Sequence, residues 1–211
     1  MTMSLIPNIV SSYVKKDYVN VNAKINKALQ IILYTSIPMT VGISILSTPI
    51  WTIFYNTNHY GGLILSINIF TALLVNINIS TSTMLQSMNK FKAVYLSVIL
   101  GFVTNGLLDV PMMYLCKYIG IESFIGSIIA TCIGYFLSIG VSIYYLKKES
   151  KDLKFKSTIN LTYKILFAVI IMFMVLFILN KVLPFDLYTR SGAMITTIIN
   201  SIIGAVIYIF I

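Results

Sequence analysis

The feature that most constrains this chain is a series of six long apolar runs separated by short polar segments. Each run holds about 20 residues, the length that an α-helix needs to cross the hydrocarbon core of a bilayer. Of the 211 residues, 58% are hydrophobic and only 10% are charged. A soluble domain of this size needs more charged residues to cover its surface. The runs lack strand-like alternation, so they predict helices and not a barrel.

The fold class expected is therefore all-α, a polytopic integral membrane helix bundle. Residues 14–27 place Tyr18, Val21 and Ile25 at helical spacing, which indicates an amphipathic connector at the membrane surface, with a soluble loop as the alternative. Both chain ends lie in apolar sequence, so we expect a part of a longer protein. The full spans are expected at 28–46, 63–86, 93–116, 124–146, 162–179 and 191–211. The expected layout is the end of a seventh helix at 1–13, the connector at 14–27, four spans within 28–146, a linker at 147–161 and two additional spans within 162–211.

The positive charges gather on one side of the predicted membrane topology. The formal net charge is +9, and this excess sits in short segments between spans, so it indicates membrane orientation and not a nucleic-acid partner. Only Lys117, Lys181 and Arg190 fall on the other side. The side rich in lysine is expected to be cytoplasmic, together with the C-terminus. Its cations are Lys15, Lys16, Lys24, Lys27, Lys90, Lys92, Lys147, Lys148, Lys151, Lys154, Lys156 and Lys164.

One charged side chain lies inside a predicted span. Asp109 is the only charge between residues 93 and 116, and a carboxylate near the middle of a span costs about 2.5–3.5 kcal/mol to insert. Asn105 lies one helical turn earlier on the same face. Pro111 cannot donate to the carbonyl of Leu107, which leaves a backbone oxygen beside both side chains. These oxygens suit a small cation or a proton relay; the alternative is a carboxylate that only bonds a neighbouring helix.

The second span is polar without being charged. Its polar residues follow one face and predict either a water-filled cavity or a helix contact. Of that face, Asn68, Asn76 and Thr83 are the candidates to line a cavity.

Small residues recur every four positions along the fourth span. Such a stripe lets two helices approach closely, so packing is favoured here over a ligand role. The stripe consists of Gly126, Ala130, Gly134, Ser138 and Ser142.

Several activities are excluded by what the sequence lacks. It holds no phosphate-cradling glycine loop, no zinc-binding spacing and no Ser/His/Asp set. It has one histidine and six acidic residues, too few for most enzymes. We therefore expect neither an enzyme, nor an ATP-driven pump, nor a transition-metal site. Cys116 and Cys132 are interpreted as small buried hydrophobes.

Several motifs together resemble the MurJ-type lipid II flippases, part of the multidrug, oligosaccharidyl-lipid and polysaccharide exporter superfamily. The motifs cover nearly the whole chain but only the C-terminal part of the family's chains, and Ser87 stands where the family usually has glycine. They are SLIP at 4–7, YVKKD at 13–17, NKAL at 26–29, LSTPIWTIFY at 46–55, LQSMNKFK at 85–92, LLDVPMMY at 107–114, Gly120 and GSIIAT at 126–131.

The resemblance implies a transporter that moves lipid II, or a similar undecaprenyl-linked substrate, across the cytoplasmic membrane by alternating access. It implies membrane lipids and a missing N-terminal bundle as partners, and a lipid-tail groove formed by residues 162–211. The family has a sodium site whose asparagine and aspartate match Asn105 and Asp109; Ser123 and Ser127 are further candidate ligands.

Three alternatives remain beside this interpretation. One is another exporter of the same superfamily, for a capsule or O-antigen unit or a drug. Another is a membrane-embedded glycosyltransferase or polymerase, which needs charged residues clustered at one membrane face. The last is a non-transporting fragment that assembles with a partner half.

Overall fold

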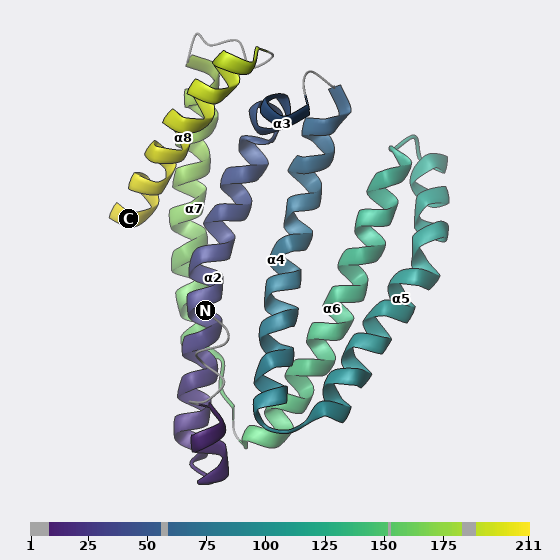
Figure 1. Cartoon of the computed structure of the whole chain (residues 1–211), viewed down its shortest axis with the longest axis vertical. Coiled ribbons are helices and arrows are strands. Elements are labelled where there is room, and N and C mark those ends of the chain that lie inside the picture. Colours follow the sequence, from purple (N-terminus) through teal and green to yellow (C-terminus); the bar gives the residue numbers. More distant parts are fainter. Residues whose placement is uncertain (1–8, 56–58, 152, 183–188) are drawn as a thin grey trace. The chain divides into compact units, whose positions relative to one another are not determined.

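The computed structural model describes residues 9–55, 59–151, 153–182 and 189–211. Those residues form helices joined by short connections, and they contain no strand (Figure 1). Six of the helices are long and apolar enough to cross a membrane, which confirms the predicted fold class. The helices are α2 (Tyr18–Ile45), α3 (Ser47–Tyr55), α4 (His59–Ser87), α5 (Phe91–Tyr118), α6 (Ser123–Ser150), α7 (Lys156–Val182) and α8 (Arg190–Phe210).

The N-terminal region differs from the expected layout. A short helical stretch at 9–14 precedes α2, while residues 1–8 lie outside the described part, so the predicted end of a seventh membrane helix stays a prediction. Asp17 caps the start of α2, because its Oδ1 accepts the backbone N–H of Asn20 at 3.1 Å. From Tyr18 the helix continues without a break into the first predicted span. The connector is thus built into α2.

The linker predicted at 147–161 is also shorter in the structure. Helix α6 continues to Ser150 and α7 begins at Lys156. The hydrophilic run therefore extends both helices, and only the few residues between them form the connection.

The chain divides into two compact units. The first unit comprises Met1–Leu33 and Leu74–Leu161, and the second comprises Tyr34–Leu73 and Thr162–Ile211. The boundaries fall inside α2, α4 and α7.

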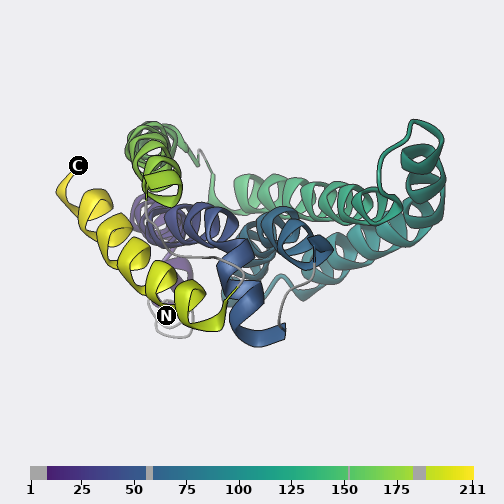
Figure 2. The same cartoon turned by 90° about the horizontal axis from the view of Figure 1, so that it is seen from above.

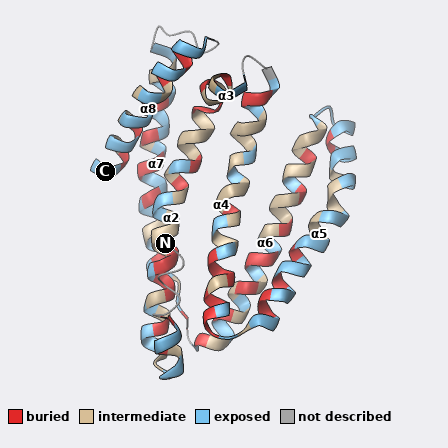
Figure 3. Cartoon of the chain, in the orientation of Figure 1, coloured by how far each residue is buried: buried red, intermediate tan, exposed pale blue. Residues whose placement is uncertain are grey.

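A hydrophobic core holds one end of the first unit together. The apolar face predicted to rest on the membrane surface packs into this core instead: Val21 and Ile25 are fully buried. Periodicity predicted this face, but only the tertiary structure shows that protein covers it. Figure 3 shows that buried residues are concentrated where α4, α5 and α6 converge. The core consists of Ile9, Val21, Ile25, Ala28, Leu29, Met84, Leu85, Met88, Ala93, Val94, Leu146 and Leu153.

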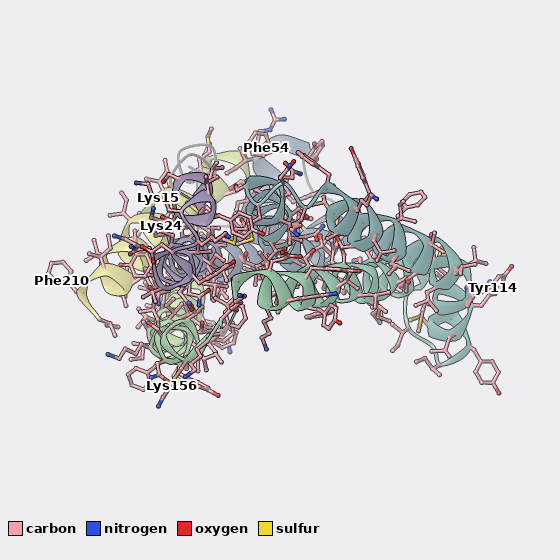
Figure 4. The ribbon with its side chains drawn as sticks, turned by 90° about the horizontal axis from the view of Figure 1, so that it is seen from below. Lys15, Lys24, Phe54, Tyr114, Lys156 and Phe210 are labelled. Atoms are coloured by element: carbon pink, nitrogen blue, oxygen red, sulfur yellow. The ribbon has the colours of Figure 1, made fainter. Side chains whose placement is uncertain are left out.

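Helices α5 and α6 form a closely packed antiparallel hairpin, side by side in both views (Figures 1 and 2). The turn uses Gly120 at φ +79°, and Ile121 N–H bonds the Cys116 carbonyl at 2.8 Å. All five residues of the small-residue stripe on α6 are buried, as predicted. The opposite face of α5 is exposed; Tyr114 points away from the ribbon in Figure 4 and is 70% exposed.

The second unit contains the end of α2, α3, the start of α4, most of α7 and α8. Helix α3 restarts the chain after α2 at Ser47, so Thr48 and Pro49 lie in its first turn, and it packs against α8. Gly61 lies so close to the Trp51 ring that a side chain there would overlap it. Tyr208 donates a 2.8 Å hydrogen bond to the Tyr34 carbonyl, which joins α8 to α2.

Candidate functional site

The α5–α6 hairpin sets the position of the intramembrane carboxylate. A Cβ built on Gly134 would lie 2.7 Å from the carbonyl oxygen of Gly101 and 3.0 Å from Cβ of Asn105. Farther along the hairpin, Gly126 lies against the backbone of Met112. Asp109 falls between these contacts on α5, so it lies at the interface with α6.

The carboxylate of Asp109 has a sealed and unsatisfied oxygen. The residue is half-buried, and Oδ1 is buried without a hydrogen-bond partner among the residues that the structure describes. The ion pair found in those same residues, Lys90–Glu149, does not involve it. A buried oxygen without a partner is costly when charged, so it favours a bound proton or cation. The alternative role is a hydrogen bond that only fixes packing. In the described part of the chain, Oδ1 has no donor that could make such a bond.

Asn105 is positioned by α6. Thr131 Oγ1 donates to Asn105 Oδ1 at 3.4 Å. An amide oxygen has two lone pairs, so this bond leaves it able to accept another donor or to coordinate a cation. The helix continues through Pro111; because proline has no N–H, the Leu107 carbonyl lacks its usual helical donor.

The two candidate serines differ in their distance from Asp109 along the hairpin. The contacts of Gly134 and Gly126 fix the antiparallel register, which puts Ser127 level with Asp109 and Ser123 about one turn farther toward the hairpin end. Ser123 is the first residue of α6, after Glu122. Ser127 is the better placed of the two.

Asn105 also lines a cavity of about 220 Å³ between α4, α5 and α6. Asn78 and Ser138 close one side of it, with the Ser138 hydroxyl donating to Asn78 Oδ1 at 2.8 Å. The full lining is Asn78, Val98, Gly101, Phe102, Asn105, Thr131, Gly134, Tyr135 and Ser138.

The three residues chosen from the second span lie elsewhere. Asn68 and Asn76 are exposed, and Asn68 belongs to the second unit. Thr83 uses its hydroxyl for the Ile79 carbonyl at 2.7 Å. The helix contributes Asn78 to the cavity, two positions and about 200° of rotation from Asn76. A repeat of asparagines in the sequence signalled a polar helix, but it did not identify which face meets α6.

The groups around Asp109 are hard oxygen ligands. Carboxylate, amide, hydroxyl and backbone oxygens suit Na⁺ or another hard cation better than a transition metal. In the described chain, no three His, Cys, Asp or Glu side chains come together as a metal cluster would need. The orphaned Asp109 oxygen therefore fits a monovalent cation, with Asn105 one turn away on the same face of α5 and Ser127 on α6 as candidate ligands. The Leu107 carbonyl, expected beside both side chains, lies instead about 200° around α5 from Asp109, on the exposed side.

The second unit holds a separate, apolar cavity of about 510 Å³. Pro38, Met39 and Ile43 line one side from α2, and Met172 and Leu176 line another from α7. Asn200 contributes a fully buried amide whose nitrogen donates to Asn180 Oδ1 at 2.5 Å.

Comparison with known proteins supports the resemblance noted from the motifs. The Lipid II flippase MurJ of Bacillus subtilis (strain 168) is 30% identical over 215 residues, which cover 99% of this chain and 38% of that protein. The chain thus spans well under half the length of this relative. No protein-family model matches the chain, and no solved structure matches it.

Proposed function

We propose that this chain is the C-terminal part of a cation-coupled flippase that carries lipid II, a lipid-linked peptidoglycan precursor, across the bacterial cytoplasmic membrane by alternating access. The observation that carries the proposal is the likeness to a protein named as a lipid II flippase, which extends over 99% of the chain. Six helices able to cross a membrane agree with a multi-pass transporter. The activity is transport, and no catalytic role is assigned to any residue.

The cation role is assigned to the interface between α5 and α6. Asp109, Asn105 and Ser127 would hold Na⁺, with Ser123 nearer the end of the hairpin. When bound, the ion supplies the positive charge that neutralises the carboxylate. This assignment is supported by the buried and unpartnered Oδ1.

The energy of that neutralisation is large enough to bias a transport cycle. A carboxylate within a span costs about 2.5–3.5 kcal/mol. If the cation binds one conformation better than the other by that amount, it shifts their ratio by roughly 100-fold. The hydrogen bond from Thr131 holds the Asn105 amide oxygen at the interface with α6.

The orientation follows from the lysines. Residues 14–27, 88–92 and 147–161 and the C-terminus are proposed to face the cytoplasm. Support comes from contacts at one end of the first unit: Glu149 pairs with Lys90 at 2.7 Å and accepts from Tyr13 at 3.1 Å. Reporter fusions at Ile211 and at Gly120 test this topology, and a reporter active outside the cell at Ile211 contradicts it.

The apolar cavity of the second unit is proposed to bind the lipid tail. Its lining from α2, α7 and α8 is almost entirely apolar, as an isoprenoid chain requires. This role belongs to the same proposal and fails with it.

Complementation tests the function directly. The chain is co-expressed with the N-terminal part of a related flippase in cells depleted of their own flippase. Restored growth and cell shape, with neither part sufficient alone, support the proposal. Growth of cells carrying the N-terminal part alone assigns the activity elsewhere, and failure of the pair when both parts are in the membrane contradicts the proposal.

One alternative is a related exporter for another lipid-linked oligosaccharide or polysaccharide. It predicts that the pair restores capsule or O-antigen export but not growth of flippase-depleted cells. The other alternative is a fragment that assembles with a partner half but does not transport. It predicts that the two parts associate in the membrane without restoring growth.

A further inference from the structure

The cavity between α4, α5 and α6 has no place in the function described so far. It is lined by two asparagines, a serine, a threonine and a tyrosine, although it lies among helices with an apolar exterior. Phe102 and Val98, which are 76% and 46% exposed, place part of its wall at the surface of the first unit. A volume of about 220 Å³ is large enough for several water molecules.

The hydrogen bonds of the cavity are incomplete in a way that favours water. Ser138 satisfies Asn78 Oδ1, and Thr131 satisfies Asn105 Oδ1. Neither amide nitrogen donates a hydrogen bond within the described residues, so their four N–H groups remain available to water. Such donors cost several kcal/mol when they lie against hydrocarbon. Water in the cavity would satisfy them.

Asn105 connects this cavity to the carboxylate. It lines the cavity, and Asp109 lies one turn farther along the same face of α5. A cation that leaves bulk water must replace its hydration shell by other oxygens in stages. The oxygens of Asn78, Ser138, Thr131 and Asn105 offer such stages in the cavity, which ends one helical turn from Asp109 at Asn105.

We propose that this cavity is hydrated and is the route by which a monovalent cation reaches Asp109. Thr131 is a positioning residue that holds the Asn105 amide. The oxygens of Asn78 and Ser138, which bond each other, replace water molecules in the hydration shell of the ion. This inference rests on the proposed cation role of Asp109.

Cysteine accessibility tests the hydrated cavity. Ser138→Cys is nearly isosteric, and Ser142→Cys is its matched control, because Ser142 lies one turn along the same buried stripe without lining the cavity. Both are made in the full chain with Cys116→Ala and Cys132→Ala, and membrane vesicles are treated with the water-soluble reagent 2-aminoethyl methanethiosulfonate. Ser138→Cys is expected to react about tenfold faster or more, because thiols in apolar surroundings stay protonated and unreactive.

Sodium then tests the route. With Na⁺ in place of choline, the labelling of Ser138→Cys slows by about twofold when half of the sites are occupied. Adding Asp109→Asn abolishes that sodium effect while fast labelling persists. If Ser138→Cys does not accumulate in the membrane, Thr131→Cys takes its place. Its labelling rate is compared with that of Ser142→Cys, and its sodium effect is measured with and without Asp109→Asn.

Each contrary result overturns one part of the proposal, either the hydrated cavity or the cation route. Equal rates at residues 138 and 142 overturn the hydrated cavity. Fast labelling that ignores Na⁺ overturns the route, as does a sodium effect that survives Asp109→Asn. The flippase proposal fails separately, through failed growth rescue, so the two failures are distinguishable.

Discussion

Gly134 of α6 lies directly against the backbone of Gly101 of α5. A methyl group at Gly134 would come within 2.7 Å of the Gly101 carbonyl oxygen, and one at Gly101 within 2.8 Å of the Gly134 carbonyl oxygen. The two helices therefore touch through backbone, with no side chain between them. This contact sets the register that places Asn105 and Asp109 against α6.

Gly134→Ala is expected to destabilise the first unit by about 1–3 kcal/mol, because the backbone cannot move aside as a flexible side chain would. Gly134→Leu is expected to disrupt the hairpin. Gly140→Ala is the control on the same helix, since its Cβ would meet nothing within 4 Å. Thermal unfolding in detergent measures both, and equal midpoints for Gly134→Ala and Gly140→Ala contradict the close approach.

Asp109→Asn is expected to remove stabilisation by sodium while leaving membrane insertion intact. In the wild-type chain, Na⁺ at 100 times its dissociation constant raises the unfolding free energy by about 2.7 kcal/mol over choline. The neutral amide loses this response because no carboxylate remains to attract the ion. Thermal unfolding at matched ionic strength measures the difference.

Asp17→Asn is the control for that experiment. Asparagine caps a helix as well as aspartate does, so this change removes a carboxylate outside the spans and keeps α2. It should leave the sodium response unchanged. If Asp109→Asn responds to sodium as the wild type does, the carboxylate is not a cation ligand.

Asn180 and Asn200 are expected to be energetically coupled. The Asn200 amide donates to Asn180 Oδ1 between α7 and α8, and side-chain hydrogen bonds within membranes contribute about 0.6 kcal/mol on average and up to about 1.7. A double-mutant cycle with Asn180→Leu and Asn200→Leu should return a coupling in this range. The cycle with Ser201→Ala in place of Asn200→Leu should return a value near zero, because Ser201 is exposed.

The ion pair of Lys90 and Glu149 is expected to contribute less than about 1 kcal/mol, because both side chains are partly exposed. The hydrogen bond that Lys90 donates to Glu149 raises the pKa of Lys90 above its ordinary value of 10.5. A raised pKa means that the contribution of Lys90 is complete below pH 10.5 and is lost only as the pH rises through the higher folded-state value.

The difference in unfolding midpoint between wild type and Lys90→Gln should therefore be constant from about pH 7 to 9.5 and shrink above about 10.5. Lys92→Gln is the control, because Lys92 is exposed nearby. A difference for Lys90→Gln that disappears already below pH 9 contradicts the raised pKa.

The fold was predictable because membrane spans depend on local composition. The run expected at 93–116 became Phe91–Tyr118, and the run at 124–146 became Ser123–Ser150. Hydrocarbon requires each span to satisfy its own backbone hydrogen bonds, so an apolar run of sufficient length already specifies a helix. The small-residue stripe likewise specified a buried face.

Faces were harder to assign than helices. Val21 and Ile25 mark an apolar face of α2 in the sequence, but the same pattern serves a membrane surface and a protein core. The structure buries both in the core of the first unit. In α4 the sequence offers Asn76 and Asn78 with equal chemistry, and only the contact with Ser138 distinguishes them.

The sequence alone determined that this chain crosses a membrane as helices and carries one carboxylate at membrane depth, because both follow from the order of apolar and charged residues along the chain. Tertiary structure alone decided that an oxygen of this carboxylate is sealed at the α5–α6 interface and that a polar cavity lies beside Asn105. Those features depend on which helices meet and in which register. That register is set by backbone contacts such as Gly101 with Gly134, which bring together residues about 30 positions apart.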